Sequence, residues 1–197
     1  VGCDAQALRR NNGRTILPGE YVCYRSHLKA LTVFYQTGEP MGIVVEDDIE
    51  FSADLLIRAG AAVEALPEAD AIKLANHRIV GFKRAAMSRT GDEIGRAMHG
   101  PQGSAACYVV THSGAERLIE GLKVMEYPWD VAIERGWASG TCIYTMRQNV
   151  ASPMRDGTTI ATQSAYRSSK FPWWKRLRTY GIRIVETARR IAYAYNI

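Results

Sequence analysis

The sequence predicts a single α/β domain with a mostly parallel central sheet and helices on its faces. Two apolar segments, residues 43–45 and 105–111, lack polar alternation, which indicates strands buried on both faces. Each is followed by a segment with helical apolar spacing, and this alternation is typical of parallel sheets. A chain of 197 residues, 47% hydrophobic, suffices for one domain with a real core.

The first half of the chain is expected to supply two helices and two strands. A helix is predicted over about residues 20–36, and Gly38 is placed to end it. After the first strand, Ser52 is expected to cap a second helix over residues 52–66. A short strand at residues 70–75 follows.

The second half is expected to begin with a long surface loop, because residues 83–104 are polar, contain glycines and are weakly periodic. After the strand at residues 105–111, Ser113 and Glu116 fit a capping box at the start of another helix. A further strand is predicted over residues 141–146.

The positive charge of the chain is concentrated in its last residues. Residues 170–197 hold seven Lys and Arg against one Glu, so of the net +5 they carry 7 − 1 = +6 and residues 1–169 carry −1. We therefore divide the chain into a globular domain, residues 1–169, and a basic C-terminal tail, residues 170–197. The basic balance of the chain says little about what the globular part binds.

The tail is expected to form an amphipathic helix, because its apolar residues recur every three or four positions. Such a helix can lie in an anionic membrane interface, or it can pack on the domain with a solvated basic face. Nucleic acid is not an expected partner, since no stacking or groove-reading motif accompanies the charge. The stripe consists of Trp173, Leu177, Tyr180, Ile184, Ala188, Ile191 and Tyr195.

The cysteines indicate a cytoplasmic protein. The four of them, Cys3, Cys23, Cys107 and Cys142, show no CxxC spacing, so buried reduced thiols are expected rather than zinc or disulfides. No segment approaches the ~20 apolar residues needed to span a bilayer. With the basic tail, these features predict a cytoplasmic location, peripheral on the inner face of a membrane.

Three consecutive carboxylates, Glu46, Asp47 and Asp48, follow the first predicted strand. In parallel α/β sheets ligands bind beyond the carboxyl ends of the strands. Residues two apart on an extended chain point to the same side, so Glu46 and Asp48 are placed to share a divalent cation such as Mg²⁺ or Mn²⁺. The alternative is a solvated acidic turn at the end of a strand.

Several segments, in order, give the chain a specific resemblance to glycosyltransferase family 25, the lipooligosaccharide-biosynthesis type. The similarity covers roughly residues 17–150. The segments are LPGEYVCYRSHLKAL at 17–31, VVEDDIEF at 44–51, DAIKL at 70–74, GSAACYVVTHSGAERL at 103–118 and YPWD at 127–130.

The resemblance implies a GT-A-like, Rossmann-like fold and a nucleotide-sugar donor. By analogy the enzyme is a hexosyltransferase that moves galactose from a UDP-sugar, with inversion, to a lipooligosaccharide or related surface glycan. Glu46 and Asp48 would hold Mn²⁺ or Mg²⁺, as the DxD-like motif of the family does, with Glu46 and Asp47 beside the donor diphosphate.

The resemblance also suggests roles for four residues near the donor. Ser26 and His27 would position it by hydrogen bonding, although a lone helical histidine is more often a packed residue. Gly103 and Ser104 would admit the sugar closely, because glycine has no side chain.

Inversion in one step needs a general base for the acceptor hydroxyl, and Asp130 is our candidate. Asp130 can equally be the N-cap of a helix over residues 131–135. Glu134 is the weaker alternative base.

Two other functions remain open at this stage. The family begins with a strand and helix that residues 1–8 match only at their end, so the chain can be a truncated, non-catalytic member that acts as a binding or accessory module. An unrelated Mg²⁺ phosphohydrolase would need a nucleophile or a second metal cluster, and the sequence offers neither.

Overall fold

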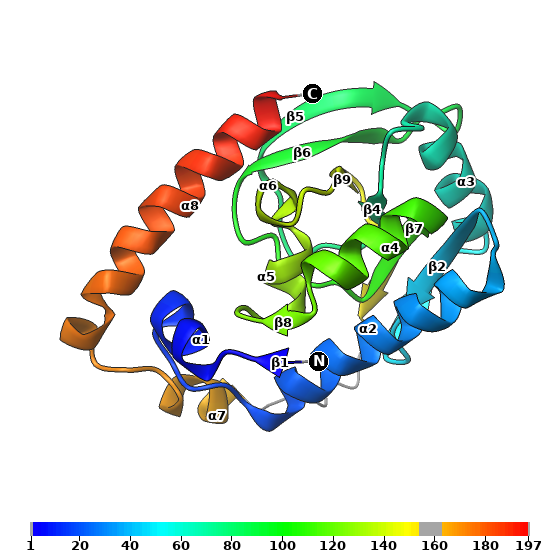
Figure 1. The fold of residues 1–197 in the computed structure, drawn as a ribbon. Helices are drawn as coiled ribbons and strands as arrows, with labels where there is room; N and C mark the ends of the chain where they lie inside the picture. The colour runs from blue at the N-terminus through cyan, green and yellow to red at the C-terminus, as the bar shows by residue number, and fades with distance from the viewer. Residues whose placement is uncertain (1, 154–162, 197) are drawn as a thin grey trace.

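The computed structural model describes residues 2–153 and 163–196 and contains both helices and strands. Residues 1 and 154–162 of the predicted globular domain and residue 197 of the predicted tail lie outside the described part. The α/β class is confirmed (Figure 1). The helices of eight or more residues are α1 (Ala5–Asn12), α2 (Pro18–Thr37), α3 (Leu55–Ala65), α4 (His112–Gly121) and α8 (Leu177–Tyr195).

The central sheet has six strands in the order β2-β7-β4-β9-β6-β5. Of its neighbouring pairs only β4 and β9 run parallel. The prediction of a mostly parallel sheet is therefore wrong. The strands are β2 (Met41–Val45), β4 (Ala71–Lys73), β5 (Val80–Met87), β6 (Glu93–His99), β7 (Cys107–Thr111) and β9 (Ile143–Met146).

The hairpin of β5 and β6 occupies most of the segment that was predicted to be a surface loop. Its turn includes Gly91 at a φ of 83°, a conformation that glycine adopts without strain. The segment looked polar because β6 buries Arg96, whose guanidinium lies 4.3 Å from the Tyr144 ring centre and 3.8 Å from that of Tyr193. A buried cation breaks the apolar pattern by which sequence analysis recognises a core strand.

The two apolar strands differ in burial because they occupy different places in the sheet. β7 lies between β2 and β4 and its first four residues are buried, as predicted. β2 ends the order of this sheet, and its residues are half-buried or exposed, so the prediction of burial on both faces is wrong there.

Helices cover both faces of the sheet and form two cores (Figure 1). Successive residues of β7 point to opposite faces, so Tyr108 packs with α2 and α4 while Val109 packs with α3. Two further helices lie on the α4 side, α5 (Trp129–Ile133) and α6 (Gly136–Ser139).

Two small sheets lie outside the central one. β1 (Gly2–Cys3) pairs in parallel with β8 (Val124–Met125), and β3 (Ile49–Phe51) pairs antiparallel with β10 (Ala151–Pro153). Short helices α7 (Gln163–Ser168) and η1 (Trp173–Arg176) precede α8.

Both predicted helix caps are wrong. Asp54 is the N-cap of α3, whereas Ser52 still belongs to the end of the β3–β10 pair and its amide donates to the Val150 carbonyl at 3.2 Å. Thr111 is the N-cap of α4, and its hydroxyl accepts from the Gly114 amide at 3.1 Å. Glu116 instead accepts a hydrogen bond from the Tyr35 hydroxyl.

The C-terminal helix α8 packs on the domain through polar side chains and turns its apolar stripe outward. Thr179 donates to the Arg10 carbonyl, Glu186 accepts from Arg135, and Tyr193 donates to the Thr141 carbonyl. The predicted alternative in which the helix packs on the domain is therefore confirmed, with Arg183 and Arg189 exposed, but the contacts are made by polar side chains and not by the apolar stripe. Leu177, Ile184 and Tyr195 are 61%, 72% and 61% exposed.

No helix among the described residues is long and apolar enough to cross a membrane. The four cysteines are free: Cys107 is buried, Cys23 and Cys142 are half-buried and Cys3 is exposed. The expectation of buried thiols is therefore wrong for Cys3.

Candidate active site

The three carboxylates lie where the chain leaves β2 and turns towards β3. Glu46 continues the pairing of the strand, because its amide donates to the Ala106 carbonyl at 2.8 Å. Asp47 and Asp48 form the turn that follows. The segment is therefore held by a backbone hydrogen bond at one end and by the β3–β10 pair at the other.

Glu46 is joined to α2 by side-chain hydrogen bonds. Nε2 of His27 lies 3.0 Å from Oε1 of Glu46, and the Cys23 thiol donates to the same oxygen at 3.8 Å. Nδ1 of His27 lies 3.2 Å from the Tyr108 hydroxyl, and the ring stacks on Trp129 at 4.9 Å. His27 is thus a packed, buried residue that also orients a candidate metal ligand.

A hollow of about 190 Å³ collects four of the predicted site residues. It brings together side chains from α2, the turn after β2, the loop before β7 and the start of α5. The predicted residues that line it are Glu46, Asp48, Ser104 and Asp130.

A second hollow adjoins the first and shares Cys23, Glu46 and Asp48 with it. Ser26, His27 and Asp47 line this second hollow, whose volume is about 570 Å³. The structure therefore brings every predicted site residue except Gly103 to one of two connected hollows.

Asp130 lies in the first turn of α5, whose N-cap is Pro128. The alternative in which Asp130 caps this helix is therefore wrong. Burial raises the pKa of its carboxyl, and the negative charge of Glu134 adds to this rise. A half-buried carboxylate of raised pKa in a hollow has the properties of a general base.

Cys23, His27 and Glu46 are the one group of three potential metal ligands in the described ranges, with ligand atoms within 4.8 Å of one another. Burial raises the pKa of the Cys23 thiol to about 12, and the charge of Glu46 adds to the rise. The thiol is therefore protonated at neutral pH, and we assign the group to hydrogen bonding.

A comparison with known protein families places the chain in one of them. The model of glycosyltransferase family 25, described as an LPS biosynthesis protein, matches residues 4–133 of the 197. The chain belongs to glycosyltransferase family 25. None of the curated proteins compared with it matches at a significant level.

The region matched by the family 25 model contains every residue predicted for the site, including His27, the three consecutive carboxylates and Asp130. It ends before Glu134, and the whole of α8 lies beyond it.

Glu134 organises the loop beside the site from a fully buried position. One of its oxygens accepts from Nζ of Lys73 at 2.7 Å and from the Gly103 amide at 3.1 Å. The other accepts from the Gln102 amide at 3.0 Å and from Arg190 at 3.0 Å. With its carboxylate enclosed in this way, Glu134 is a supporting residue, and its assignment as an alternative base is withdrawn.

The loop held by Glu134 has unusual backbone conformations next to the hollow. Gly103 has a φ of 68° and Ser104 a φ of 57°. A non-glycine residue with positive φ is uncommon and such residues cluster at functional sites. Gly103 lines neither hollow, and its amide donates to Glu134 in the loop that carries Ser104.

Sequence analysis missed Lys73 and Arg190 as parts of this support. Lys73 had a readable signal, because a lysine inside the apolar strand segment DAIKLA is almost never buried without a partner. Arg190 had none, since its contact depends on where α8 docks.

Proposed function

We propose that this member of family 25 is a metal-dependent, inverting hexosyltransferase that moves galactose from UDP-galactose to a lipooligosaccharide or related surface glycan. Family membership supports the glycosyltransferase class. The single observation that supports the mechanism is the meeting of Glu46, Asp48 and Asp130 in one hollow.

The carboxylates suit a hard divalent cation. Mg²⁺ and Mn²⁺ prefer oxygen ligands, and they often take one or two protein carboxylates and complete their shell with water and substrate phosphates. Glu46 and Asp48 line the same two hollows, and His27 holds one oxygen of Glu46 in place. A bound cation would offset the negative charge on the departing UDP.

The remaining residues of the two hollows suit the donor. Ser26, His27 and Asp47 line the larger hollow, where hydroxyl and carboxylate groups can hydrogen-bond a nucleotide sugar. Ser104 lines the smaller hollow beside Asp130 and would lie near the sugar.

Asp130 would act as the base. The acceptor hydroxyl oxygen attacks the anomeric carbon from the face opposite UDP, the bond from that carbon to the UDP oxygen breaks, and the hydroxyl proton passes to Asp130. Its raised pKa increases its strength as a base, because general-base efficiency rises as the pKa nears the working pH.

The test measures Mn²⁺-dependent hydrolysis and transfer of several UDP-sugars by the wild type, Asp48→Asn and Asp130→Asn. Asp54→Asn is the matched control, because Asp54 makes no side-chain capping bond. Asp130→Asn should lower kcat by about 10²–10⁴-fold. Asp48→Asn should weaken Mn²⁺ binding measured by calorimetry.

Unchanged Mn²⁺ binding and activity in Asp48→Asn would remove the metal role. Donor binding with no turnover of any sugar by the wild type would favour the non-catalytic binding module instead.

The apolar face of α8 suggests that the enzyme meets its acceptor at an anionic membrane on the cytoplasmic side. Leu177, Ile184 and Tyr195 are exposed on this face, and Arg178 and Arg189 flank it. A second copy of the chain fits less well, since two such faces would bring like charges together. Apolar residues flanked by arginine are typical of helices that lie in the plane of an anionic interface.

Vesicle co-sedimentation tests this contact. Ile184→Asp should reduce binding to vesicles that contain phosphatidylglycerol, because a charge replaces an apolar side chain at the interface. Val22→Asp is the control, since Val22 is a 63% exposed apolar residue of α2. Equal binding by the two variants would contradict the contact.

A further inference from the structure

A cavity distinct from the two hollows of the site lies between α1, α5 and α8. It has a volume of about 510 Å³ and shares no residue with either hollow. Among the residues that the structure describes, its lining holds seven Lys and Arg side chains and one carboxylate, Glu186. In Figure 1, α8 runs past α1 on its way to the β5–β6 hairpin, and α5 lies inside that curve.

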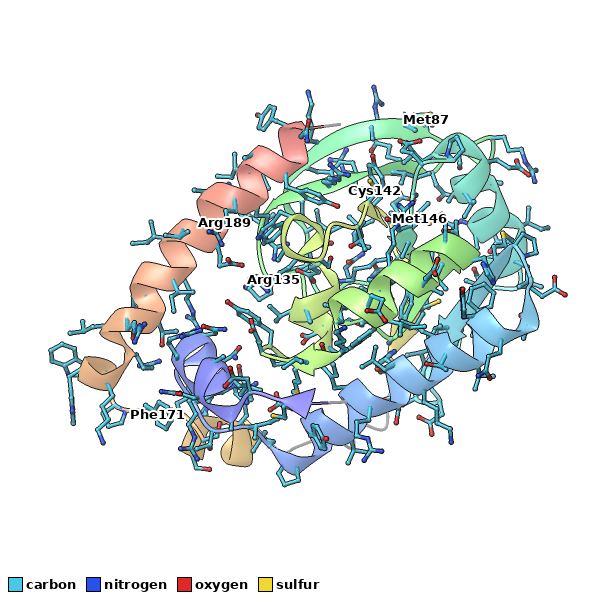
Figure 2. All side chains as sticks on the ribbon, viewed as in Figure 1. Met87, Arg135, Cys142, Met146, Phe171 and Arg189 are labelled. Carbon is cyan, nitrogen blue, oxygen red and sulfur yellow. The ribbon has the colours of Figure 1, made fainter. Side chains whose placement is uncertain are left out.

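Three of the seven cations form ion pairs. Arg14 pairs with Glu20, Arg135 with Glu186 and Arg190 with Glu134. Figure 2 shows Arg135 on the side of the domain that faces α8, the helix that carries Glu186.

The other four cations have no carboxylate partner among the described residues. They are Arg78, Lys170, Arg176 and Arg183. Nε of Arg176 is moreover buried without a hydrogen-bond acceptor. A buried donor left unpaired costs free energy, and the charge of an anion beside the guanidinium would offset part of that cost.

Two glycines leave space for two of the seven cations, Arg190 and Arg176. A Cβ at Gly100 would collide with the guanidinium of Arg190. A Cβ at Gly13 would lie 3.0 Å from the side chain of Arg176, and the φ of 66° at Gly13 already favours glycine. Arg190 and Arg176 are therefore held in the cavity wall, whereas Arg78, Lys170 and Arg183 line the cavity as exposed side chains.

We propose that this cavity binds a phosphate group of the acceptor. Arginine presents paired donors that match phosphate oxygens, and four unpaired cations in one concave space attract a group of multiple negative charge. Their mutual repulsion falls when an anion enters, which favours binding.

The cavity and the active site share structural elements. In α5, Asp130 lines the smaller hollow and Val131 lines the cavity. The loop before β7 contributes Pro101 to the cavity and Ser104 to the hollow. A phosphorylated glycan bound in the cavity would therefore have its sugar portion near the proposed base. This acceptor role rests on the proposed function, whereas binding of the phosphate does not.

The test uses the full chain in EDTA, without donor, so that no metal or nucleotide enters. Calorimetry compares glucose 6-phosphate with glucose and compares the wild type with Arg78→Ala/Arg183→Ala. Arg178→Ala is the matched control, because Arg178 lies on the same helix outside the cavity lining. Arg183→Gln alone serves if the double variant does not fold.

The phosphorylated sugar should bind and glucose should not, and the double variant should bind at least about tenfold more weakly. The control should bind like the wild type. Equal affinity in the double variant and the wild type, or equal affinity for glucose, would overturn the proposal.

Vesicles identify the source of the phosphate. Loss of binding to phosphatidylglycerol vesicles in the double variant, without binding of glucose 6-phosphate, would assign the site to a phospholipid headgroup. Loss of glucose 6-phosphate binding would assign it to a phosphorylated glycan. Failure of transfer with phosphate binding intact would count against the proposed activity alone.

Discussion

At the scale of single residues, His27 combines two roles that sequence analysis set against each other. It is buried, stacked on Trp129 and hydrogen-bonded to Tyr108, as expected of a packed histidine. Its other nitrogen reaches Glu46, as expected of a site residue. Because core contacts hold the ring in place, its hydrogen bond limits the movement of Glu46, the candidate metal ligand.

Asp130→Asn should stabilise the protein at neutral pH while it lowers kcat for transfer. The raised pKa means that the native state binds this proton more tightly than the unfolded state. Ionisation of Asp130 in the native state therefore lowers the free energy of unfolding. This loss grows as the pH rises from the pKa of Asp130 in the unfolded state to its higher pKa in the folded state. Asparagine removes that cost, so its Tm should exceed that of the wild type at pH 8, and the gain should vanish near pH 3.

Thermal unfolding followed by circular dichroism at both pH values measures this difference. A lower Tm for the variant at pH 8 would contradict the desolvation of Asp130. The kcat of the wild type should also rise with pH as Asp130 ionises.

At the scale of elements, Glu134 joins α5, β4, α8 and the loop before β7. Removal of one member of a buried ion pair costs about 3–5 kcal/mol, because the other charge is left uncompensated. Lys73→Met and Glu134→Gln should each cause such a loss. In a double-mutant cycle the losses should be far from additive, since Lys73 Nζ lies 2.7 Å from Glu134.

Urea unfolding of the three variants provides these free energies. Additive losses would show that the contact between Lys73 and Glu134 contributes little.

The β5–β6 hairpin is attached to α3 by a second ion pair. Arg58 Nε donates to Asp92 at 3.1 Å, and the hydrogen bonds from Arg58 are the largest cause of the lowered pKa of Asp92. The stability that this ion pair contributes is fully present above the pKa of Asp92 in the unfolded state. It is lost as the pH falls through the lowered pKa of Asp92 in the folded state. Asp92→Asn should cost about 1–3 kcal/mol at pH 7.

Urea midpoints at pH 7 and pH 2 test this expectation, and the difference between variant and wild type should shrink at the lower pH. Glu64→Gln is a suitable control, because Glu64 forms an exposed pair with Arg89. Equal losses at both pH values would mean that Asp92 acts through packing.

At the scale of the whole molecule, α8 makes buried contacts with the rest of the chain. Arg96 of β6 donates to the carbonyls of Tyr193 and Asn196 at 2.8 and 2.7 Å. Removal of residues 177–197 should therefore take the two α8 carbonyls from buried Arg96 and the Arg190 guanidinium from buried Glu134, and so lower the urea midpoint strongly. Ile184→Ser, on the outward face, should leave the midpoint nearly unchanged.

The comparison separates the two faces of α8. A truncated chain as stable as the wild type would show that the helix only rests on the domain. A strong effect of Ile184→Ser would show that the outward face is covered in solution.

Elements whose patterns are local could be predicted from the sequence. The helix predicted at residues 20–36, the strand at residues 105–111 and the strand at residues 141–146 are present, because apolar spacing and glycine termination act over a few residues. The family was likewise readable, since motifs in order identify a family without knowledge of the fold.

Strand direction, strand position and helix orientation depend instead on contacts between segments far apart in the chain. β2 and β7 look alike as sequences, yet only β7 has a neighbour on each side and is fully enclosed. The strand β6 was not predicted, because its buried Arg96 packs on tyrosine rings from β9 and α8, which lie far away in the sequence. The apolar stripe of α8 faces outward, because Arg190 and Glu186 on the other side of the helix pair with Glu134 and Arg135 of the domain.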